Sequence, residues 1–224
     1  MSRETPAPGV VVFQPRRGFR YAADAFWLAG FALEGGRART VVDLGTGSGI
    51  VALLLAGRGL DVVGVDVRPE WRPCWEASLS ASDVRCRFIQ DDVASWRGGP
   101  VDLVVANPPY FPAGSGPVAA DPLRAAARME TTAGLADFVA AALAMADRAC
   151  FVLPSEREPV ALAAAREEGA GAVRRVRVGR RRVLLELRPG APGADPVQVH
   201  EDHPRVRRWY RSITGASEAQ DDLA

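Results

Sequence analysis

The chain has 224 residues, 48% of them hydrophobic, and a formal net charge of +1. This length favours one domain whose core is large enough to fold without a structural metal or disulfides. The three cysteines are far apart and odd in number, and the sequence has no apolar leader and no apolar run of about eighteen residues. These features argue against a disulfide framework, secretion and a membrane span. We therefore expect a soluble, cytoplasmic protein, either a monomer or a weak homodimer.

All basic residues are arginines, and they are clustered although the net charge is small. Such clusters are typical both of nucleic-acid contacts and of solvated faces, and charge alone favours neither interpretation. The clusters comprise Arg16, Arg17 and Arg20, then Arg174, Arg175, Arg177, Arg180, Arg181 and Arg182, and finally Arg205, Arg207, Arg208 and Arg211.

The first 39 residues are predicted to form an arm and a covering helix that belong to the main domain. Residues 1–9 contain two prolines and are expected to be disordered, while residues 10–14 favour a short strand or extended arm. A helical pattern with Asp24 as its N-cap then ends at the glycines 35 and 36. We expect this helix to cover the mouth of the sheet.

Residues 40–189 alternate between strand and helix patterns. The strands are predicted from short apolar, β-branched runs at 41–45, 61–65, 84–89, 101–105, 150–153, 173–178 and 183–187. Helices are expected at 48–56, from Pro69 onward, at 135–146 and at 156–168. The alternation predicts an α/β fold with a Rossmann-like, mostly parallel seven-stranded sheet, helices on both faces and an antiparallel last hairpin.

Residues 190–224 are predicted to be a C-terminal extension and tail, in which Trp209 and Tyr210 return to the body of the domain. The sequence His200-Glu201-Asp202-His203 contains possible metal ligands. It lies in a polar turn, and the chain has no third histidine, so we expect no metal site.

A glycine-rich loop joins the first predicted strand of the sheet to the following helix. Glycines let the backbone turn sharply and let a ligand approach closely. A dinucleotide fingerprint that starts at Gly45 would need glycine at position 50, where Ile50 stands, so the spacing argues against a nicotinamide cofactor. The loop instead has the form D-x-G-x-G-x-G, with Asp43, Gly45, Gly47 and Gly49 at the fixed positions. A glycine turn without a ligand is the alternative.

Acidic residues follow the next two strands. Asp66 ends the second strand about twenty residues after the loop, where a carboxylate can hold a ribose diol, and Val67 could lie against an adenine ring. Asp91 and Asp92 follow the third strand, and either could simply cap the next turn.

Asn107-Pro108-Pro109-Tyr110 ends the fourth predicted strand. Proline forces Asn107 into an extended conformation at the carboxyl end of the strand, where open α/β sheets bind ligands. The side-chain oxygen of Asn107 and the carbonyl of Pro108 can accept both hydrogens of a planar exocyclic amine, while Tyr110 can stack on the ring that carries it. An ordinary proline-rich turn is the alternative.

From residue 40 to 189 the sequence resembles the class I S-adenosylmethionine-dependent methyltransferases, through the glycine loop and the acids after the strands. The tetrapeptide narrows the resemblance to the branch that methylates amines conjugated to a ring or carbonyl. The resemblance implies S-adenosyl-L-methionine as cofactor, and an acid at Asp92 that accepts from the adenine amine. It implies cofactor contacts at Asp24, Asp43, Gly45, Gly47, Gly49, Asp66, Val67, Asp92 and Asn107.

The outer segments are similar to those of bacterial tRNA adenine-N6-methyltransferases. The similarity lies in Phe13-Gln14-Pro15 with Gly18, Asp24 leading into Leu28-Ala29-Gly30, Arg128, and Arg182-Val183-Leu184-Leu185, although Ala23 stands where relatives often have Ser or Thr. It implies RNA, most simply tRNA, as the partner. It also implies catalytic residues Asn107, Pro108 and Tyr110, with substrate contacts from Tyr110, Phe111, Arg128, Arg180, Arg181 and Arg182.

Three other functions stay open from the sequence. A release factor glutamine N5-methyltransferase shares the tetrapeptide but usually has its own helical N-terminal domain, for which 39 residues are too few. A ribosomal RNA guanine-N2 methyltransferase is the second alternative. The third is a cofactor-binding RNA-interaction protein without catalysis, against which the intact tetrapeptide argues.

Overall fold

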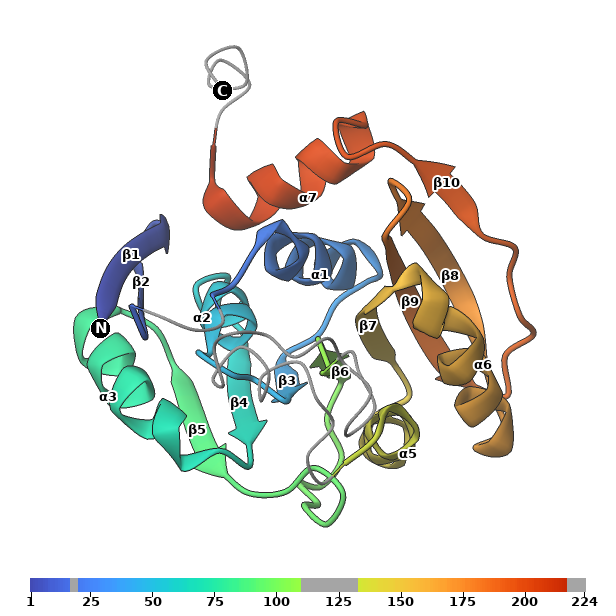
Figure 1. Cartoon of the computed structure of the whole chain (residues 1–224), viewed down its shortest axis with the longest axis horizontal. Helices are drawn as coiled ribbons and strands as arrows, with labels where there is room; N and C mark the ends of the chain where they lie inside the picture. Colours follow the sequence, from blue (N-terminus) through green and yellow to red (C-terminus); the bar gives the residue numbers. More distant parts are fainter. Residues whose placement is uncertain (17–19, 110–132, 217–224) are drawn as a thin grey trace.

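The computed structural model describes residues 1–16, 20–109 and 133–216, and its centre is an eight-stranded sheet (Figure 1). The strand order is β10-β8-β9-β7-β6-β3-β4-β5. Five pairings are parallel, and the two that involve β9 are antiparallel. The strands are β3 (Thr40–Leu44), β4 (Asp61–Asp66), β5 (Cys86–Gln90), β6 (Leu103–Ala106), β7 (Ala149–Pro154), β8 (Ala170–Val178), β9 (Arg182–Pro189) and β10 (Val197–Val199).

The predicted α/β fold is confirmed, with a mostly parallel sheet and an antiparallel hairpin formed by β8 and β9. The predicted number of strands is wrong, because β10 adds an eighth strand at the edge. It pairs in parallel with β8, with Val197 opposite Val176 and Val199 opposite Val178. A strand of three residues is too short for a periodic pattern to reveal it.

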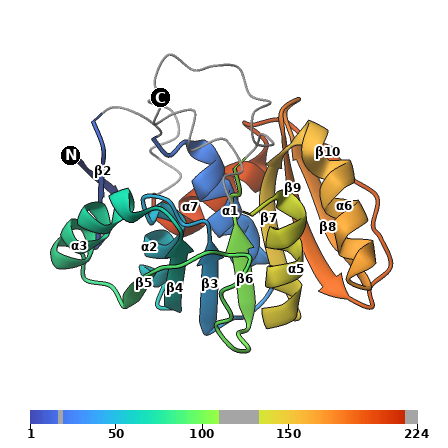
Figure 2. The ribbon, with the colours of Figure 1, turned by 60° about the horizontal axis from the view of Figure 1, so that its bottom comes forward.

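Helices cover both faces of the sheet (Figure 2). One hydrophobic cluster joins α1, α2, α7 and the N-terminal hairpin of β1 (Ser2–Ala7) and β2 (Val10–Gln14) to the sheet, and a second joins α5 and α6 to the opposite face. The helices are α1 (Ala23–Glu34), α2 (Ile50–Ala56), α3 (Arg72–Ala81), α5 (Leu135–Met145), α6 (Glu158–Glu167) and α7 (Pro204–Thr214), with short 3-10 turns η1 (Pro69–Trp71) and η2 (Ser155–Arg157). Within the described residues, no helix is long and apolar enough to cross a membrane.

The N-terminal residues form an antiparallel hairpin, so the expected disordered lead is wrong. Strand β1 (Ser2–Ala7) pairs with β2 (Val10–Gln14), and Gly9 makes the turn between them with φ of 73°. The backbone N–H of Phe13 donates to the hydroxyl of Ser78 on α3, and that of Val11 donates to the hydroxyl of Ser82, the C-cap of α3, both at 2.8 Å. The two prolines and the polar composition indicate disorder locally, but these tertiary hydrogen bonds stabilise the strand.

Helix α1 differs from its prediction at its start and in its position. Ala22 is the N-cap, and Asp24 lies in the first turn, so the predicted Asp24 cap is wrong. The helix packs on the face of the sheet rather than across its mouth, with Phe31 in one cluster with Cys150 and Leu184.

Helix α7 returns to the body of the domain, as the sequence predicts for Trp209. Gly30 allows α1 and α7 to approach closely, because a Cβ there would lie 2.3 Å from Trp209 Cβ. Trp209 is 1% exposed and packs edge-on against Phe31, with ring centroids 5.5 Å apart.

Candidate functional site

The carboxyl ends of β3, β4 and β6 lie side by side, and several predicted site residues gather there. Leu44 at the end of β3 is opposite both Val65 and Ala106. The glycine loop follows β3, Asp66 ends β4, and Asn107 directly follows β6. The sheet therefore brings the loop, the carboxylate and the amide to one edge.

The loop has a conformation that requires glycine. Gly45, Gly47 and Gly49 have φ values of 68°, 56° and 85°, a region that side chains with a Cβ rarely adopt. Space is also limited, because a Cβ on Gly45 would lie 2.9 Å from Phe138 Cε1 and one on Gly49 would lie 2.5 Å from Phe88 Cζ. The loop is thus a tight glycine cradle, and its backbone is held by the Gly45 and Thr46 N–H groups, which both donate to the Val65 carbonyl, at 2.8 and 3.0 Å.

Asp43 lies beneath the loop and is 1% exposed. Its Oδ2 accepts hydrogen bonds from Thr46 Oγ1 at 2.6 Å and from the Ala52 N–H at 3.1 Å. Burial raises the pKa of Asp43 to about 7, although these two hydrogen bonds oppose the shift. Asp43 therefore joins the loop to α2, and the pKa of its carboxyl group lies close to neutral pH.

Asp66 connects the loop to the segment after β4. It is 5% exposed, and its Oδ2 accepts from the Gly47 N–H at 2.9 Å. Its Oδ1 accepts from the Arg68 N–H at 3.0 Å and pairs with Arg68 Nε at 3.4 Å. Each carboxylate oxygen has further lone-pair capacity, so the same group can also accept from a hydroxyl of a ligand.

Asp92 and Val67 lie after β5 and β4, and both are half-buried. Asp92 Oδ1 accepts from the Ala94 N–H at 2.9 Å, which is the turn-capping role that the sequence left open. Asp91 caps locally as well, accepting from the Asp92 N–H at 2.8 Å.

At the end of β6, Asn107 is half-buried and Pro108 is buried. The predicted site residues Tyr110, Phe111 and Arg128 lie outside the described residues. The described part of the predicted acceptor site is therefore the amide of Asn107 and the backbone of Pro108.

The late arginine cluster divides into paired and unpaired residues. Arg175 and Arg177 both pair with the buried Glu158, at 2.8 and 2.7 Å. Arg182 Nε lies 3.3 Å from Asp24 Oδ2. Arg180 and Arg181 are exposed at the tip of the β8–β9 hairpin, and their side chains have no hydrogen-bond or ion-pair partner among the described residues.

A methyltransferase domain family matches residues 41–134, the stretch that contains the glycine loop and the strand ends. A tRNA1(Val) (adenine(37)-N6)-methyltransferase from Shewanella amazonensis is 31% identical over 218 residues, which cover 90% of each chain. The chain belongs to the S-adenosylmethionine-dependent methyltransferases. Its cofactor is S-adenosyl-L-methionine.

Other relatives match over shorter stretches. A tRNA1(Val) (adenine(37)-N6)-methyltransferase from Aeromonas salmonicida is 36% identical over 108 residues, 46% of this chain and 45% of the relative, so this match spans less than half of its length. A release factor glutamine methyltransferase from Chlorobaculum tepidum is 37% identical over 94 residues, 38% of this chain and 32% of that protein. The solved ribosomal protein L11 methylase from Lactobacillus delbrueckii shares the fold, with a TM-score of 0.57, 19% identity and coverage of 79% and 89% of the two chains.

Two tryptophans of the methyltransferase lie against the glycine loop. Trp75 Nε1 donates to the Gly47 carbonyl at 2.7 Å. Trp71 is 4% exposed, and its Nε1 has no hydrogen-bond partner in the described part of the chain. Its Cζ2 would lie 3.9 Å from a Cβ on Gly47. The cradle, the Asp66 carboxylate and this buried donor fit a polar cofactor such as S-adenosylmethionine.

Trp71 and Trp75 are both buried, and the sequence did not place either of them in the site. Their spacing of four residues predicts one helical face, but it does not reveal that this face meets the loop. The contact with Gly47 was therefore missed.

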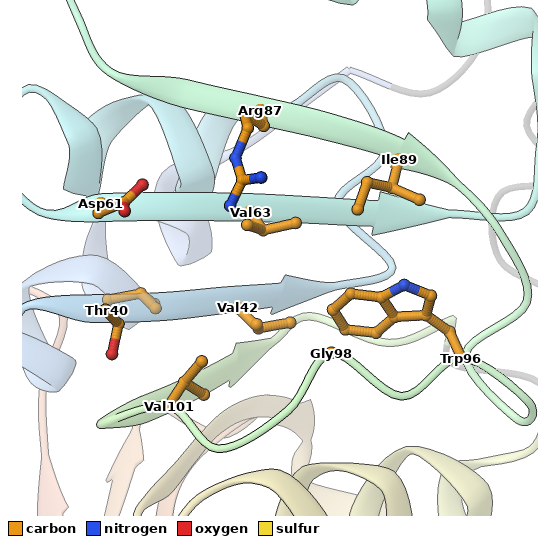
Figure 3. A pocket seen from close by; sticks show the side chains of 10 residues that line it. Thr40, Val42, Asp61, Val63, Arg87, Ile89, Trp96, Gly98 and Val101 are labelled. Atoms are coloured by element: carbon orange, nitrogen blue, oxygen red, sulfur yellow. The ribbon is translucent and has the colours of Figure 1, made fainter.

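A pocket of about 300 Å³ lies away from the predicted site residues of the methyltransferase (Figure 3). Val42, Val63 and Ile89 from β3, β4 and β5 form its apolar floor, Trp96 closes one side and Arg87 extends over Val63. It lies along the face of the sheet and not at the strand ends where the loop and Asn107 lie.

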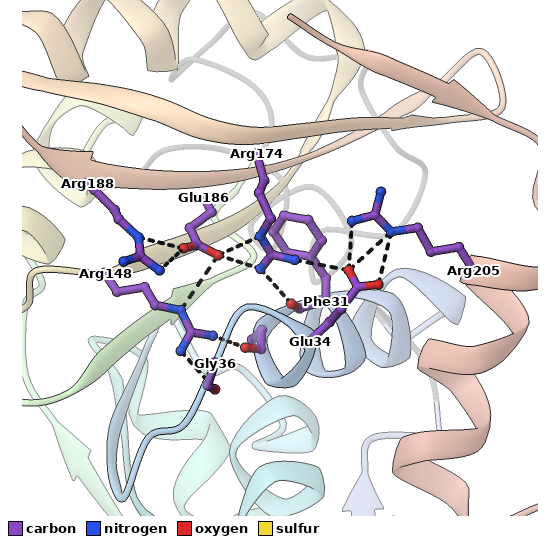
Figure 4. Close-up of polar contacts among 9 residues, drawn as sticks. Phe31, Glu34, Gly36, Arg148, Arg174, Glu186, Arg188 and Arg205 are labelled. Carbon is purple, nitrogen blue, oxygen red and sulfur yellow. Dashed lines mark hydrogen bonds and ion pairs between the residues drawn. The ribbon is translucent and has the colours of Figure 1, made fainter. Parts of the chain in front are cut away.

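A buried ion network fastens the C-terminal end of α1 to the sheet (Figure 4). Glu186 is 1% exposed and accepts from Arg174 Nε at 2.7 Å and from Arg188 Nε at 2.8 Å, with Arg148 Nε at 3.6 Å. Arg148 and Arg174 also donate to the α1 carbonyls of Ala32 and Phe31, and Arg174 and Arg205 pair with Glu34. The network fixes the helix whose first turn carries Asp24.

No group of three or more His, Cys, Asp or Glu side chains suited to a metal ion occurs among the described residues. His203, in the segment that contained possible ligands, instead caps α7, since its Nδ1 accepts from the Arg205 N–H at 3.2 Å.

Proposed function

We propose that this methyltransferase methylates the exocyclic N6 amine of an adenosine in RNA, in a tRNA near the anticodon. The observation that carries the proposal is the position of Asn107 and Pro108, at the end of β6 and one strand away from the glycine loop after β3. The similarity to the Shewanella amazonensis enzyme over 90% of both chains supports adenine in tRNA as the acceptor.

An adenine amine is a poor nucleophile because its lone pair is delocalised into the ring. The Asn107 side-chain oxygen and the Pro108 carbonyl would accept its two hydrogens and favour a pyramidal nitrogen whose lone pair points at the methyl donor. Bound S-adenosylmethionine supplies an electrophilic methyl group on a sulfonium. No dedicated general base is needed, because the methylated nitrogen becomes acidic and loses its proton late.

The remaining predicted residues fall into a cofactor group and an RNA group. We propose that Asp43, Asp66, Asp92, Val67 and the three loop glycines contact the cofactor, and that Asp24 lies at the border of its site. Arg180 and Arg181 at the hairpin tip would contact RNA phosphates, which attract exposed cations. Tyr110 would stack on a base that has left its helix, with Phe111 and Arg128 beside it.

Release factor glutamine methylation is the second candidate, favoured by the 94-residue match to the Chlorobaculum tepidum enzyme. That match covers only 32% of the relative, and a glutamine side-chain amide needs the same two acceptors as adenine. The acceptor atoms alone therefore do not separate the two substrates.

Labelled methyl transfer separates them directly. The purified protein is incubated with methyl-labelled S-adenosylmethionine and, in parallel, with unmodified bulk tRNA, ribosomal RNA or release factor. We expect label in tRNA, and nucleoside analysis should recover it as N6-methyladenosine. Label found only in release factor would overturn the RNA assignment, and N2-methylguanosine from ribosomal RNA would replace adenine with guanine as the acceptor.

A further inference from the structure

Both backbone polar groups of Gly47 are bound by side chains from different elements. Its N–H donates to Asp66 Oδ2 at the end of β4, at 2.9 Å. Its carbonyl accepts from Trp75 Nε1 on α3, at 2.7 Å. Glycine has more backbone conformations available than other residues, and Gly47 uses one with φ of 56°. The two hydrogen bonds therefore stabilise this conformation of the loop over the others.

Trp75 is itself held in one orientation. It is 3% exposed and stacks on Phe88 of β5, with ring centroids 5.2 Å apart and planes 14° apart. The Phe88 ring in turn fills the space beside two glycines, since a Cβ on Gly49 or on Gly64 would lie 2.5 or 2.6 Å from it. The indole therefore has little freedom to turn away from the loop.

The helix that carries Trp75 is also fixed. Ser78 follows Trp75 by three residues, so these two side chains lie on one face of α3, and Ser82 is the C-cap residue directly after the helix. The two hydroxyls bind the backbone of β2 at Phe13 and Val11, each at 2.8 Å. One helical face thus joins the N-terminal hairpin at one end to the glycine loop at the other.

We propose that Trp75 is a positioning residue for S-adenosylmethionine, holding the Gly47 carbonyl so that the loop has its binding conformation before the cofactor arrives. A ligand that binds only one loop conformation loses affinity in proportion to the fraction of protein in that conformation. Loss of a buried hydrogen bond shifts such an equilibrium by about five- to tenfold. The inference concerns the cofactor, and it does not depend on which acceptor is methylated.

The test is Trp75→Phe, which keeps an aromatic ring to stack on Phe88 and removes the N–H donor. Titration calorimetry with S-adenosylhomocysteine, in the absence of RNA, should show Kd about five- to tenfold higher. With saturating S-adenosylmethionine, kcat should stay within about twofold of the wild-type value, because the loop is restored by mass action. Trp96→Phe is the matched control, since Trp96 lines the separate pocket, and its Kd should be unchanged.

Wild-type affinity in the Trp75→Phe variant would overturn the proposal, as would an equal loss in the Trp96→Phe control. A variant with Kd unchanged but a much lower Tm would show a structural role only. If the variant does not fold, amide exchange of the wild-type protein decides. The Gly47 N–H should be protected before cofactor is added, and rapid exchange that slows only with S-adenosylhomocysteine would contradict a preformed loop.

Discussion

Arg182 at the start of β9 lies beside Asp24 in the first turn of α1, with Nε 3.3 Å from Oδ2. The sequence assigned these residues to different partners, Asp24 to the cofactor and Arg182 to RNA. Their ion pair joins α1 to β9 directly beside the hairpin tip that presents Arg180 and Arg181, since Arg182 pairs with Val178 at the turn. An experiment therefore has to distinguish a structural role of Arg182 from RNA contacts made by Arg180 and Arg181.

Substitution of the tip arginines should weaken RNA binding, whereas substitution of Arg182 should mainly affect stability. For Arg180→Gln with Arg181→Gln we expect a lower affinity for tRNA and a slope of log K against log salt that is smaller by about 1 to 2, from lost phosphate contacts. Arg182→Gln should keep the slope and lower the free energy of unfolding by about 1 kcal/mol. Filter binding across a salt series measures the slopes, and an unchanged slope in the double variant would make the tip merely a solvated turn.

Asn107→Ala should separate catalysis from cofactor binding. Without one of two acceptors for the amine, kcat should fall by about 100-fold or more, while Kd for S-adenosylhomocysteine should change only a few-fold. Asp91→Ala, an exposed acid at the same edge of the sheet, is the control and should keep full activity. Single-turnover kinetics measures the transfer step, and turnover at the wild-type rate would remove Asn107 from the mechanism.

Two glycines with the same backbone angle give a matched test of the loop. Gly49 and Gly59 both have φ of 85°, but a Cβ on Gly49 would meet Phe88 at 2.5 Å, whereas one on Gly59 meets nothing within 4 Å. Gly59→Ala should lower the free energy of unfolding by about 1 kcal/mol, because of the backbone angle alone. Gly49→Ala should cost about 1 to 3 kcal/mol more from overpacking and should lower cofactor affinity. Urea unfolding gives the comparison, and equal costs would mean that Phe88 moves aside.

Asp43 should make the stability of the protein fall as pH rises. Burial raises its pKa from 3.8 to about 7, so between about pH 4 and pH 7 the folded state binds a proton that the unfolded state has released. Stability from this group is therefore complete below about pH 4 and is lost as pH approaches 7. Asp43→Asn keeps an oxygen for Thr46 and Ala52 and removes the titration, so urea unfolding should show a flatter profile from pH 4 to 7.

Asp102 is the control for that experiment because its pKa shifts in the opposite direction. Hydrogen bonds from the backbone of Thr40 and Arg39 lower the pKa of Asp102. The contribution of Asp102 to the free energy of unfolding is present above its ordinary pKa and is lost as pH falls through the lowered pKa. Asp102→Asn should therefore change the profile only at acidic pH, and an identical response of the two variants would contradict the Asp43 assignment.

Glu186→Gln should destabilise the fold strongly. It would leave Arg148, Arg174 and Arg188 without their shared carboxylate, and Arg148 is 5% exposed. Removal of one partner from a buried ion pair costs about 3 to 5 kcal/mol. Glu34→Gln, at a more exposed carboxylate, should cost about 1 kcal/mol or less. Denaturant titration ranks the two variants, and a Glu186 cost no larger than that of Glu34 would contradict a structural role for the network.

The parts of the fold that follow from the sequence are those with local signals. The apolar strand at 41–45, the glycines with their positive φ angles and Asp66 at a strand end all depend on residues close together in the chain. The position of the β1–β2 hairpin, strand β10 and the Trp75 contact depend on partners that are distant in sequence, such as Ser78 for β2 and Val176 for β10. Local patterns carry no information on such pairings, so prediction failed there.

The arginines show the same limit for the candidate site. A cluster of arginines in sequence indicates a basic surface, yet Arg174, Arg175 and Arg177 of β8 are bound to carboxylates within the fold. Successive side chains of a strand point to opposite faces of the sheet, so neighbouring arginines of β8 meet different carboxylates. The buried Glu158 and Glu186 neutralise the charge of these arginines, and the sequence around β8 does not show this. Clustering in the sequence therefore does not by itself locate a basic surface, and the two alternatives that charge left open are separated only by these pairings.

The serines in α3 and at its C-cap have a further consequence for the hairpin at the N-terminus. Ser82 Oγ accepts from the Val11 N–H at 2.8 Å and lies 3.0 Å from the Val11 carbonyl, which it approaches as a donor. Ser78 binds the next N–H group on that side of β2, at Phe13. One hydroxyl on α3 and one at its C-cap thus occupy the hydrogen-bonding groups that another strand would use. An incoming polypeptide finds no free template along this part of the edge, so α3 protects β2 from intermolecular strand addition and aggregation.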